Sequence, residues 1–327
     1  MATVRTSPPA KLNLFLEIPA RREDGFHEID TVMTAIDWRD ELEIESIPEP
    51  IVQLTAAWIP SVEQVAEELG LRHQHGEVPS MLRLPTDGSN LVVKALELFR
   101  SSFAIKTGFR VTLRKRIPAA AGMGGASSDA AHAIACAAQI HQIDSESNSL
   151  HQIAASVGSD VPFFLPSFHS DGSAVTTTHA TGRGEMLSPI HTGTSIDFVV
   201  AYPAAGLSTA AVYRKLRVPS KPQTSAAFRS ALEAGDRDSM SELMMNRLSE
   251  PALEILPQLR DLRDSLWQSD EQTCQLTGSG SAMFAVMRDA DHAQEVVNRL
   301  RIQLTPGVLL RVARTVPAAA HIETVPS

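Results

Sequence analysis

A glycine-rich segment that runs directly into a helix constrains this chain more than any other part of its sequence. Residues 118–128 read Pro-Ala-Ala-Ala-Gly-Met-Gly-Gly-Ala-Ser-Ser, and an alanine-rich helical stretch follows over residues 129–140. A helix start offers unpaired backbone N–H groups and the positive end of the helix dipole, and small residues leave both open to a close approach. The segment therefore predicts either a phosphate-binding loop or a flexible turn before a closely packed helix.

The loop matches neither of the two commonest nucleotide-binding motifs. A P-loop requires a lysine after its last glycine, and residues 117–140 contain none. A dinucleotide fingerprint begins as Gly122 and Gly124 do, but it requires a glycine or an alanine where Ser127 stands. Ser127 and Ser128 favour the phosphate alternative, because their hydroxyls can cap the helix or bind an anion or its metal.

Composition and charge limit the partners that this chain can have. Its 327 residues are 43% hydrophobic, which is enough for a substantial core and for two domains that meet near residues 166–172. A formal net charge of −9 opposes the binding of a nucleic acid. Cys136 and Cys274 lie far apart and form no CxxC pair, so we expect neither a disulfide framework nor a zinc cluster.

The sequence also predicts where the chain works. No apolar run approaches the ~20 residues of a membrane span. The first expected strand begins by Ala10, which leaves no room for a targeting peptide. We therefore expect a cytoplasmic protein without membrane contact, either a monomer or a homodimer, whose partners are small molecules.

Hydrophobic periodicity predicts a mixed α+β chain. Strands are expected over residues 10–18, 29–36, 41–47, 109–113, 174–178 and 196–201. We expect helices from residue 90 and over residues 129–140, 149–157 and 208–216, a helical pattern over 224–267, and the order strand, strand, helix, strand over 275–316. Residues 48–87 are rich in proline and polar residues and are interpreted as an insertion with one short helix after Ser61.

Two polar residues on the first expected strand are candidates for chemistry. Lys11 and Asn13 alternate with leucines, so their side chains project from the same face of the strand. The alternative for Lys11 is an ordinary lysine in contact with solvent on an outer face, which is the commoner place for this residue.

Three further positions have two interpretations each. Asp160 follows a helix end and precedes Val-Pro-Phe-Phe-Leu, which surrounds its carboxylate with apolar residues, although most loop aspartates only cap a turn or contact water. His27 has no second histidine at metal-ligand spacing and is expected to be an ordinary polar histidine. Residues 277–281, Thr-Gly-Ser-Gly-Ser, form either a tight hairpin turn or a set of amides directed at an anion.

Three segments, taken in order, resemble a known set of motifs. They are Pro-Ala-Lys-Leu-Asn-Leu over residues 9–14, the loop over 118–128 with Asp-Ala-Ala after it, and Leu-Thr-Gly-Ser-Gly-Ser over 276–281. This pattern resembles the GHMP kinases, the small-molecule kinases typified by galactokinase, homoserine kinase and mevalonate kinase. The resemblance implies a two-lobed α+β fold, with a ribosomal-protein-S5-like ATP-binding lobe over residues 1–168, a ferredoxin-like lobe over 169–327 and the active site between them.

Three other segments are similar to one branch of these kinases. They lie at residues 22–29, 158–164 and 180–185. The branch uses ATP to phosphorylate the 2-hydroxyl of a cytidine diphosphate-linked methylerythritol in the non-mevalonate route to isoprenoid precursors. The alternatives are a GHMP kinase that acts on homoserine or mevalonate, and a non-catalytic anion-binding protein of the same fold.

The resemblance implies a role for each matching position. Asp160 would be the catalytic base and Lys11 its partner. The ATP phosphates would lie against Pro118, Ala119, Ala120, Ala121, Gly122, Met123, Gly124, Gly125, Ala126, Ser127 and Ser128, with Lys115 and Asn90 near the adenine or ribose. The substrate would contact Asn13, Phe26, His27, Tyr213, Gly278, Ser279 and Gly280, of which Phe26, His27 and Tyr213 would bracket the cytosine. Mg²⁺ is expected from the chemistry of ATP rather than from a carboxylate cluster.

The chemistry of phosphoryl transfer is compatible with a loop that lacks lysine. The reaction depends mainly on positioning and on charge stabilisation, which backbone amides, a helix dipole and magnesium can supply. The sequence departs from the pattern of the family at Met123 and Ala126, where leucine and a further glycine are usual, and at Ala211, where proline is common. The insertion over residues 48–87 is longer than family members usually carry, and it could border the nucleotide pocket or alter self-association.

Overall fold

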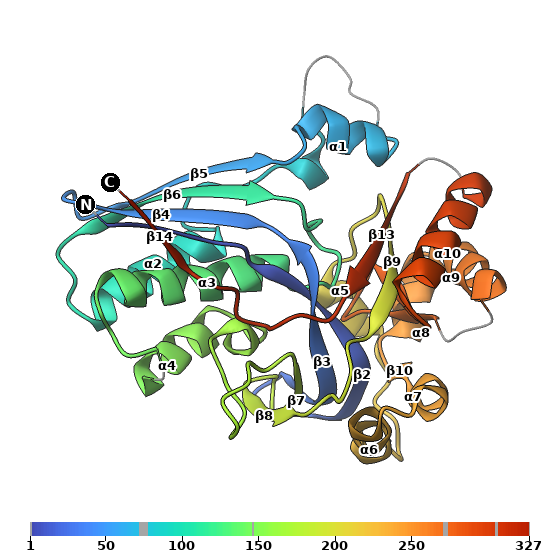
Figure 1. Cartoon of the computed structure of the whole chain (residues 1–327). Coiled ribbons are helices and arrows are strands. Elements are labelled where there is room, and N and C mark those ends of the chain that lie inside the picture. Colours follow the sequence, from blue (N-terminus) through green and yellow to red (C-terminus); the bar gives the residue numbers. More distant parts are fainter. Residues whose placement is uncertain (1, 72–77, 146, 271–273, 305–306, 327) are drawn as a thin grey trace.

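The computed structural model describes residues 2–71, 78–145, 147–270, 274–304 and 307–326. These residues form three β-sheets with helices packed against them (Figure 1). The architecture is mixed α+β, which confirms the expected fold class. None of the described helices combines the length and the apolar character that crossing a membrane requires.

The first sheet has the strand order β14-β1-β4-β6-β5, and all its pairs are antiparallel except β5 with β6. Helices α2 and α3 pack against this sheet, and α4 packs against both helices (Figure 1). The strands are β1 (Thr3–Thr6), β4 (Glu41–Ile47), β5 (Val52–Trp58), β6 (Gly108–Lys115) and β14 (Glu323–Val325). The helices are α2 (Leu91–Ser102), α3 (Gly125–Ile140) and α4 (Asn148–Val157).

The second sheet contains the strand that carries Lys11. Its order is β10-β2-β3-β7-β8, and the register of β2 against β3 shifts between Asn13 and Phe15. Strand β2 is buried on both faces from Pro9 to Ile18, so the alternative of a solvent-exposed Lys11 is wrong. The strands are β2 (Pro9–Arg21), β3 (His27–Arg39), β7 (Thr177–Thr181), β8 (Met186–Ile190) and β10 (Met245–Asn246).

The third sheet is wholly antiparallel, with the order β11-β12-β9-β13. Its sequence of strand, strand, helix, strand confirms the expectation for residues 275–316. The helical pattern over 224–267 divides into four helices and the short strand β10. The elements are β9 (Asp197–Pro203), α5 (Thr209–Lys215), α6 (Ala226–Ala234), α7 (Arg237–Leu243), α8 (Ser249–Ile255), α9 (Gln258–Asp270), β11 (Cys274–Leu276), β12 (Met283–Met287), α10 (Ala290–Gln303) and β13 (Val308–Arg314).

The insertion contains more structure than expected. Helix α1 (Val62–Glu68) begins after Ser61, which forms the capping box that the sequence predicts. Strand β5 was not predicted, and it adds a parallel edge strand beside β6. The described residues also form two single 3₁₀ turns, η1 (Ser80–Leu82) and η2 (Pro162–Phe164).

The strand expected over residues 174–178 is misplaced. Strand β7 runs from Thr177 to Thr181. The strand begins at Thr177 because β7 pairs with β3 only from that residue onward, with Thr177 opposite Thr34.

Candidate active site

A cavity of about 1190 Å³ lies between the glycine-rich loop, strand β2 and helix α5. Nearly all of the positions with a predicted role line it, although they come from segments far apart in the sequence. The lining residues include Lys11, Asn13, Phe26, His27, Asn90, Lys115, Pro118, Ala119, Ala120, Ala121, Gly122, Met123, Gly124, Gly125, Ala126, Ser127, Asp160, Tyr213, Gly278 and Ser279. Ser128 and Gly280 are not among the lining residues. The fold therefore brings the three predicted motifs to one cleft.

The helix after the glycine-rich loop begins earlier than the sequence predicts. Gly124 adopts a left-handed conformation with φ of 69° and ends the loop, so α3 begins at Gly125 rather than at residue 129. Ser127 and Ser128 therefore lie inside the first turn, and neither caps the helix. The first-turn residues 125–127 all line the cavity, and the backbone N–H groups of a first turn have no acceptor within the helix.

The three motifs are interlocked at the bottom of the cleft. A Cβ atom on Gly122 would lie 2.1 Å from the carbonyl oxygen of Thr277, so only glycine fits between the loop and the turn after β11. The Thr277 hydroxyl donates to the carbonyl of Gly122 over 3.3 Å. The backbone N–H of Lys11 donates to the carbonyl of Met123 over 2.9 Å. The glycine-rich loop is thereby fixed to both neighbours.

Lys11 and Asp160 form an ion pair in this cleft. Nζ of Lys11 lies 3.6 Å from Oδ2 of Asp160 and also donates to Oδ1 of Asn13. The Asn13 amide is held by the Thr31 hydroxyl over 2.9 Å, and that hydroxyl donates to the carbonyl of Phe15. The Lys11 side chain is 3% exposed and that of Asp160 is 36% exposed. The cation is therefore fixed, while the carboxylate faces the open cleft.

Aromatic side chains lie at the end of the cleft next to Asp160. The rings of His27 and Tyr213 are 5.0 Å apart between centroids. Burial, with the charge of Asp160, raises the pKa of Tyr213 to about 12, so its hydroxyl is protonated at neutral pH. Burial and Arg21 lower the pKa of His27, which favours the neutral imidazole. Phe26 is exposed, and its ring lies under the guanidinium of Arg183 at 4.3 Å.

A buried ion cluster lies behind the start of α3. Nζ of Lys115 contacts Oδ2 of Asp40 and lies 2.5 Å from Oδ2 of Asp129. Burial alone would lower the pKa of Lys115, but the two carboxylates outweigh it and raise the pKa above its ordinary value. Burial raises the pKa of Asp129, and the negative charge of Asp40 raises it further. The positive charge of Lys115 lowers this pKa by a smaller amount, so the pKa remains above its ordinary value. Sequence analysis missed Asp40 and Asp129, because only the fold brings them to Lys115.

Asn90 serves first as a helix cap. Its side-chain oxygen accepts from the backbone N–H of Val92, and its amide donates to the carbonyl of Pro85. It lines the same part of the cavity as Lys115, Pro85 and Leu91. The insertion therefore borders the large cavity through its last residues.

The fold and this cleft define a kinase of the GHMP class. A family model for the GHMP kinases N terminal domain matches residues 90–167, and a model for the GHMP kinases C terminal matches residues 228–305. A crystal structure of a homoserine kinase from Cytophaga hutchinsonii has the same fold, with a TM-score of 0.67 at 16% identity over 99% of this chain and 97% of that one. The resemblance to the GHMP kinases is thus confirmed.

Closer relatives identify the branch. The chain is 43% identical to the 4-diphosphocytidyl-2-C-methyl-D-erythritol kinase of Rhodopirellula baltica, over 97% of each protein. It is 32% identical to the enzyme of the same name from Geobacillus kaustophilus, over 90% of this chain and 91% of that relative. A crystal structure of 4-(cytidine 5'-diphospho)-2C-methyl-D-erythritol kinase matches with a TM-score of 0.69 at 27% identity, over 94% of this chain and 98% of that one. The chain belongs to the family of 4-diphosphocytidyl-2-C-methyl-D-erythritol kinases.

Proposed function

We propose that this chain transfers the γ-phosphoryl group of ATP to the 2-hydroxyl of 4-diphosphocytidyl-2-C-methyl-D-erythritol. The observation that carries this proposal is the ion pair of Lys11 and Asp160, which lies between the glycine-rich loop and the aromatic pair of His27 and Tyr213. A phosphoryl donor bound at the glycine-rich loop and an acceptor whose planar base lies against the aromatic pair fit this order of groups. Membership of the family supports the same reaction.

In this mechanism the glycine-rich loop holds the phosphates of ATP. The free N–H groups of the first turn of α3 and the positive end of its dipole favour negative charge at that point. Asn90 and Lys115 line the cavity and would lie toward the nucleoside. The charge of Lys115 is already balanced by Asp40 and Asp129, so its contribution to ATP binding is the shape of the wall rather than a free cation.

Magnesium fits the oxygen atoms near the start of α3. Oδ1 of Asp129 is buried without a hydrogen-bond partner among the described residues, and Asp129 and Ser127 both line the cavity. Mg²⁺ usually binds through one or two protein oxygens, substrate phosphates and water. When bound, the ion would neutralise charge on the phosphates.

The transfer step assigns different roles to Lys11 and Asp160. The substrate hydroxyl oxygen forms a bond to the γ-phosphorus as the bond between that phosphorus and the bridging oxygen of ADP breaks. Asp160 accepts the hydroxyl proton late, because the loose transition state makes the hydroxyl more acidic. Lys11 orients Asp160 through their ion pair, and its charge stabilises the transferred group.

The far end of the cleft would bind the cytidine. His27 and Tyr213 offer planar faces, and Phe26 offers a third that is exposed on the free enzyme. Asn13, Gly278 and Ser279 lie closer to Lys11 and would contact the methylerythritol end. Gly280 would act indirectly, by shaping the turn that carries Gly278.

We also propose a boundary between an ATP-binding domain over residues 1–168, which includes the insertion at about 48–87, and a C-terminal domain over 169–327. The two family models match on opposite sides of it. Three strands cross this division, since β7 pairs with β3, β10 with β2 and β14 with β1. The two domains would therefore be joined by shared sheets as well as by packing.

The experiment for the proposed function is an assay of ADP release with three acceptors at equal concentration. We expect turnover with the cytidyl substrate and background rates with homoserine and mevalonate. CDP and CMP should inhibit competitively against the cytidyl substrate, because they occupy the aromatic end of the cleft. Turnover of homoserine or mevalonate without turnover of the cytidyl compound would contradict the proposal, and so would the absence of turnover with all three.

A further inference from the structure

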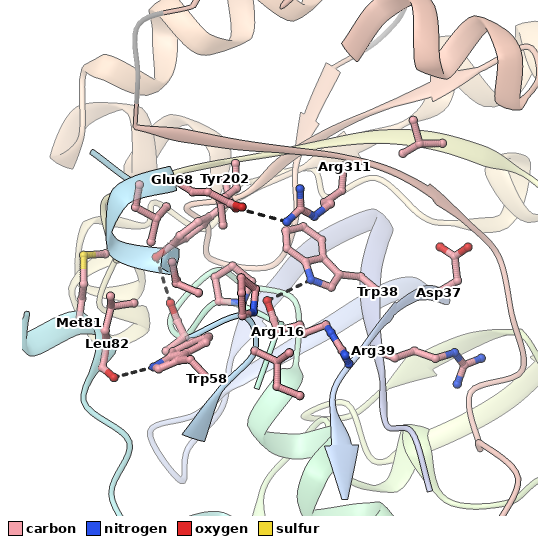
Figure 2. Close-up of a pocket in the computed structure, with 18 residues that line it drawn as sticks. Asp37, Trp38, Arg39, Trp58, Glu68, Met81, Leu82, Arg116, Tyr202 and Arg311 are labelled. Carbon is pink, nitrogen blue, oxygen red and sulfur yellow. Dashed lines mark hydrogen bonds and ion pairs between the residues drawn. The ribbon is translucent and has the colours of Figure 1, made fainter. Parts of the chain in front are cut away.

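A second cavity, of about 440 Å³, lies on the other side of the start of the glycine-rich loop (Figure 2). It shares only Pro118 and Ala119 with the large cavity. The insertion forms one wall, through Trp58, helix α1 and Leu82, and strands β9 and β13 form the opposite wall. Its volume falls within the range of about 300–1,000 Å³ that is usual for small-molecule pockets.

Two tryptophans give this cavity flat apolar walls. Trp38 is 7% exposed and its indole N–H donates to the carbonyl of Arg116, while Trp58 is 8% exposed and donates to the carbonyl of Leu82. Because both N–H groups are already bonded, each ring is fixed and presents its apolar surface. Figure 2 shows the two indoles with Tyr202, whose hydroxyl donates to the carbonyl of Ala119 over 3.3 Å. The cavity is thus built to contact a planar group.

Guanidinium groups exceed carboxylates around the same space. The guanidinium of Arg311 lies 5.8 Å from the centroid of the Trp38 ring, and its ion pair with Glu68 is long, at 3.4 Å (Figure 2). Arg116 shares the carboxylate of Glu41 with Arg114. Around Glu41, two guanidinium groups share one carboxylate, which leaves an excess of positive charge.

Arg39 contributes to the lining, but its guanidinium points away from the two indoles and donates to the carbonyl of Ser7 (Figure 2). Burial lowers the pKa of Arg39, and the charge of Asp37 opposes this shift. Asp37 also accepts from the backbone N–H of Arg314. The guanidinium that an incoming anion would meet beside the indoles is therefore that of Arg311.

We propose that this cavity is a second ligand site, separate from the active site, for a small organic anion with a flat ring. The ring would lie against Trp38 and Trp58, and the anionic group would approach Arg311, with Arg116 nearby. Arginine recognises carboxylate, sulfonate and phosphate groups through its planar set of donors. The insertion over residues 48–87 supplies one side of this site, which gives that segment a function.

The test uses two dyes that differ only in an anionic group, 8-anilinonaphthalene-1-sulfonate and N-phenyl-1-naphthylamine. The protein carries Trp267→Phe, since Trp267 is exposed on α9 and the two remaining tryptophans both line the cavity. Energy transfer from tryptophan to bound dye then reports occupancy of this site. Saturating ADP is present throughout, so that the nucleotide pocket is filled.

We expect energy transfer to the sulfonate that persists in the presence of ADP. Arg311→Gln should weaken binding of the sulfonate at least tenfold and leave binding of the uncharged dye within about threefold. Arg114→Gln is the control, because it also removes one guanidinium that is paired with a glutamate, but outside the cavity, and it should change neither affinity. Arg116→Gln, which also removes a guanidinium of the lining, provides a second test if Arg311→Gln does not fold, as judged by circular dichroism.

Three results would overturn the proposal. The first is displacement of the sulfonate by ADP, which would place the dye in the nucleotide pocket. The second is the absence of energy transfer from the two cavity tryptophans. The third is an equal loss of affinity for the sulfonate in Arg311→Gln and Arg114→Gln, which would mean that the dye responds only to the overall charge of the surface.

Discussion

Two buried lysines lie on opposite sides of the glycine-rich loop, and their surroundings differ. Lys11 has one carboxylate partner, Asp160, at 3.6 Å, and that carboxylate is partly exposed to the cleft. Lys115 contacts two carboxylates, Asp40 and Asp129, and all three side chains are almost completely buried. We refer to the first pair as the substrate end of the loop and to the second cluster as the helix end.

The difference separates chemistry from stability. At the substrate end the Asp160 carboxylate remains partly exposed, so a substrate hydroxyl and a phosphoryl group can approach the ion pair. At the helix end the charges balance one another, and removal of one leaves buried charge without compensation. The same residue type therefore has two functions, and substitutions should separate them.

The largest effect is expected at the substrate end, from Asp160→Asn. Loss of the base should lower kcat by about 10³–10⁴-fold, within the range of general base catalysis. The affinity for ADP should change by less than about twofold, because the loop that binds phosphate is intact. Steady-state kinetics with the cytidyl substrate and calorimetry with ADP give the two values. Asp171→Asn, in an exposed turn, is the control and should remain fully active; full activity of Asp160→Asn would refute the mechanism.

A pair of methionine substitutions compares the two lysines directly. Lys115→Met should lower the free energy of unfolding by about 3–5 kcal/mol, since it leaves two buried carboxylates unpaired. Lys11→Met should lower it by less than about 1 kcal/mol, because Asp160 can be solvated from the cleft, yet should abolish most activity. Urea unfolding at neutral pH measures both variants. Adding Asp129→Asn to Lys115→Met should recover part of the lost stability, because one unpaired carboxylate is removed. Equal stability of Lys115→Met and Lys11→Met would contradict the proposed difference between the two lysines.

A pH effect is expected from His132, which lies on α3 three residues after Asp129 of the helix end. Its Nδ1–H donates to the carbonyl of Ser128, its Nε2 accepts from the backbone N–H of Ala320, and burial lowers its pKa from 6.5 to about 4. Between pH 4 and pH 6.5, the His132 imidazole is protonated in the unfolded chain but not in the folded chain. The free energy of unfolding therefore decreases as the pH falls through this range. From pH 7 to pH 5 this contribution is about 2 kcal/mol.

Urea unfolding of the wild type and of His132→Gln at both pH values isolates this contribution. The variant is expected to be less stable at pH 7, because its side chain reproduces the two backbone bonds poorly. From pH 7 to pH 5, the free energy of unfolding of the variant should fall by about 2 kcal/mol less than that of the wild type. Identical pH dependence in the two proteins would show that His132 does not titrate differently in the folded and unfolded chains.

The smallest expected effect lies at the aromatic part of the substrate end. Tyr213→Ala should raise KM for the cytidyl substrate about tenfold with little change in kcat, because stacking on a base contributes about 1–3 kcal/mol. Tyr213→Phe keeps the ring and should behave as the wild type. A fall in kcat with unchanged KM in Tyr213→Ala would instead assign the ring to the transfer step.

The sequence allowed the substrate end to be predicted better than the helix end. Lys11 and Asn13 could be placed side by side because strand alternation is a local rule, and their burial followed only from the second sheet. Asp160 required the family resemblance, since its local sequence is compatible with an ordinary turn. Asp40 has no local signal that would connect it with Lys115, 75 positions later.

The fold shows the same division between local and distant determinants. Helix α1 was predicted from its capping box, and the order of elements in the third sheet from their periodicity. The start of α3 at Gly125 was missed, because Gly125 is a poor helix former and the left-handed Gly124 sets the boundary. Strands β5 and β14 were missed because each is an edge strand that is stabilised by a partner elsewhere in the chain.

The pairing of β14 with β1 affects the order in which a newly made chain can complete its fold. Thr3–Thr6 precede Glu323–Val325 in the chain, so β1 is synthesised long before its partner β14. Until β14 is made, this edge of the first sheet offers unpaired backbone groups to any neighbouring strand. A partly synthesised chain therefore carries an open sheet edge at β1, and a pause in synthesis before residue 323 prolongs its exposure.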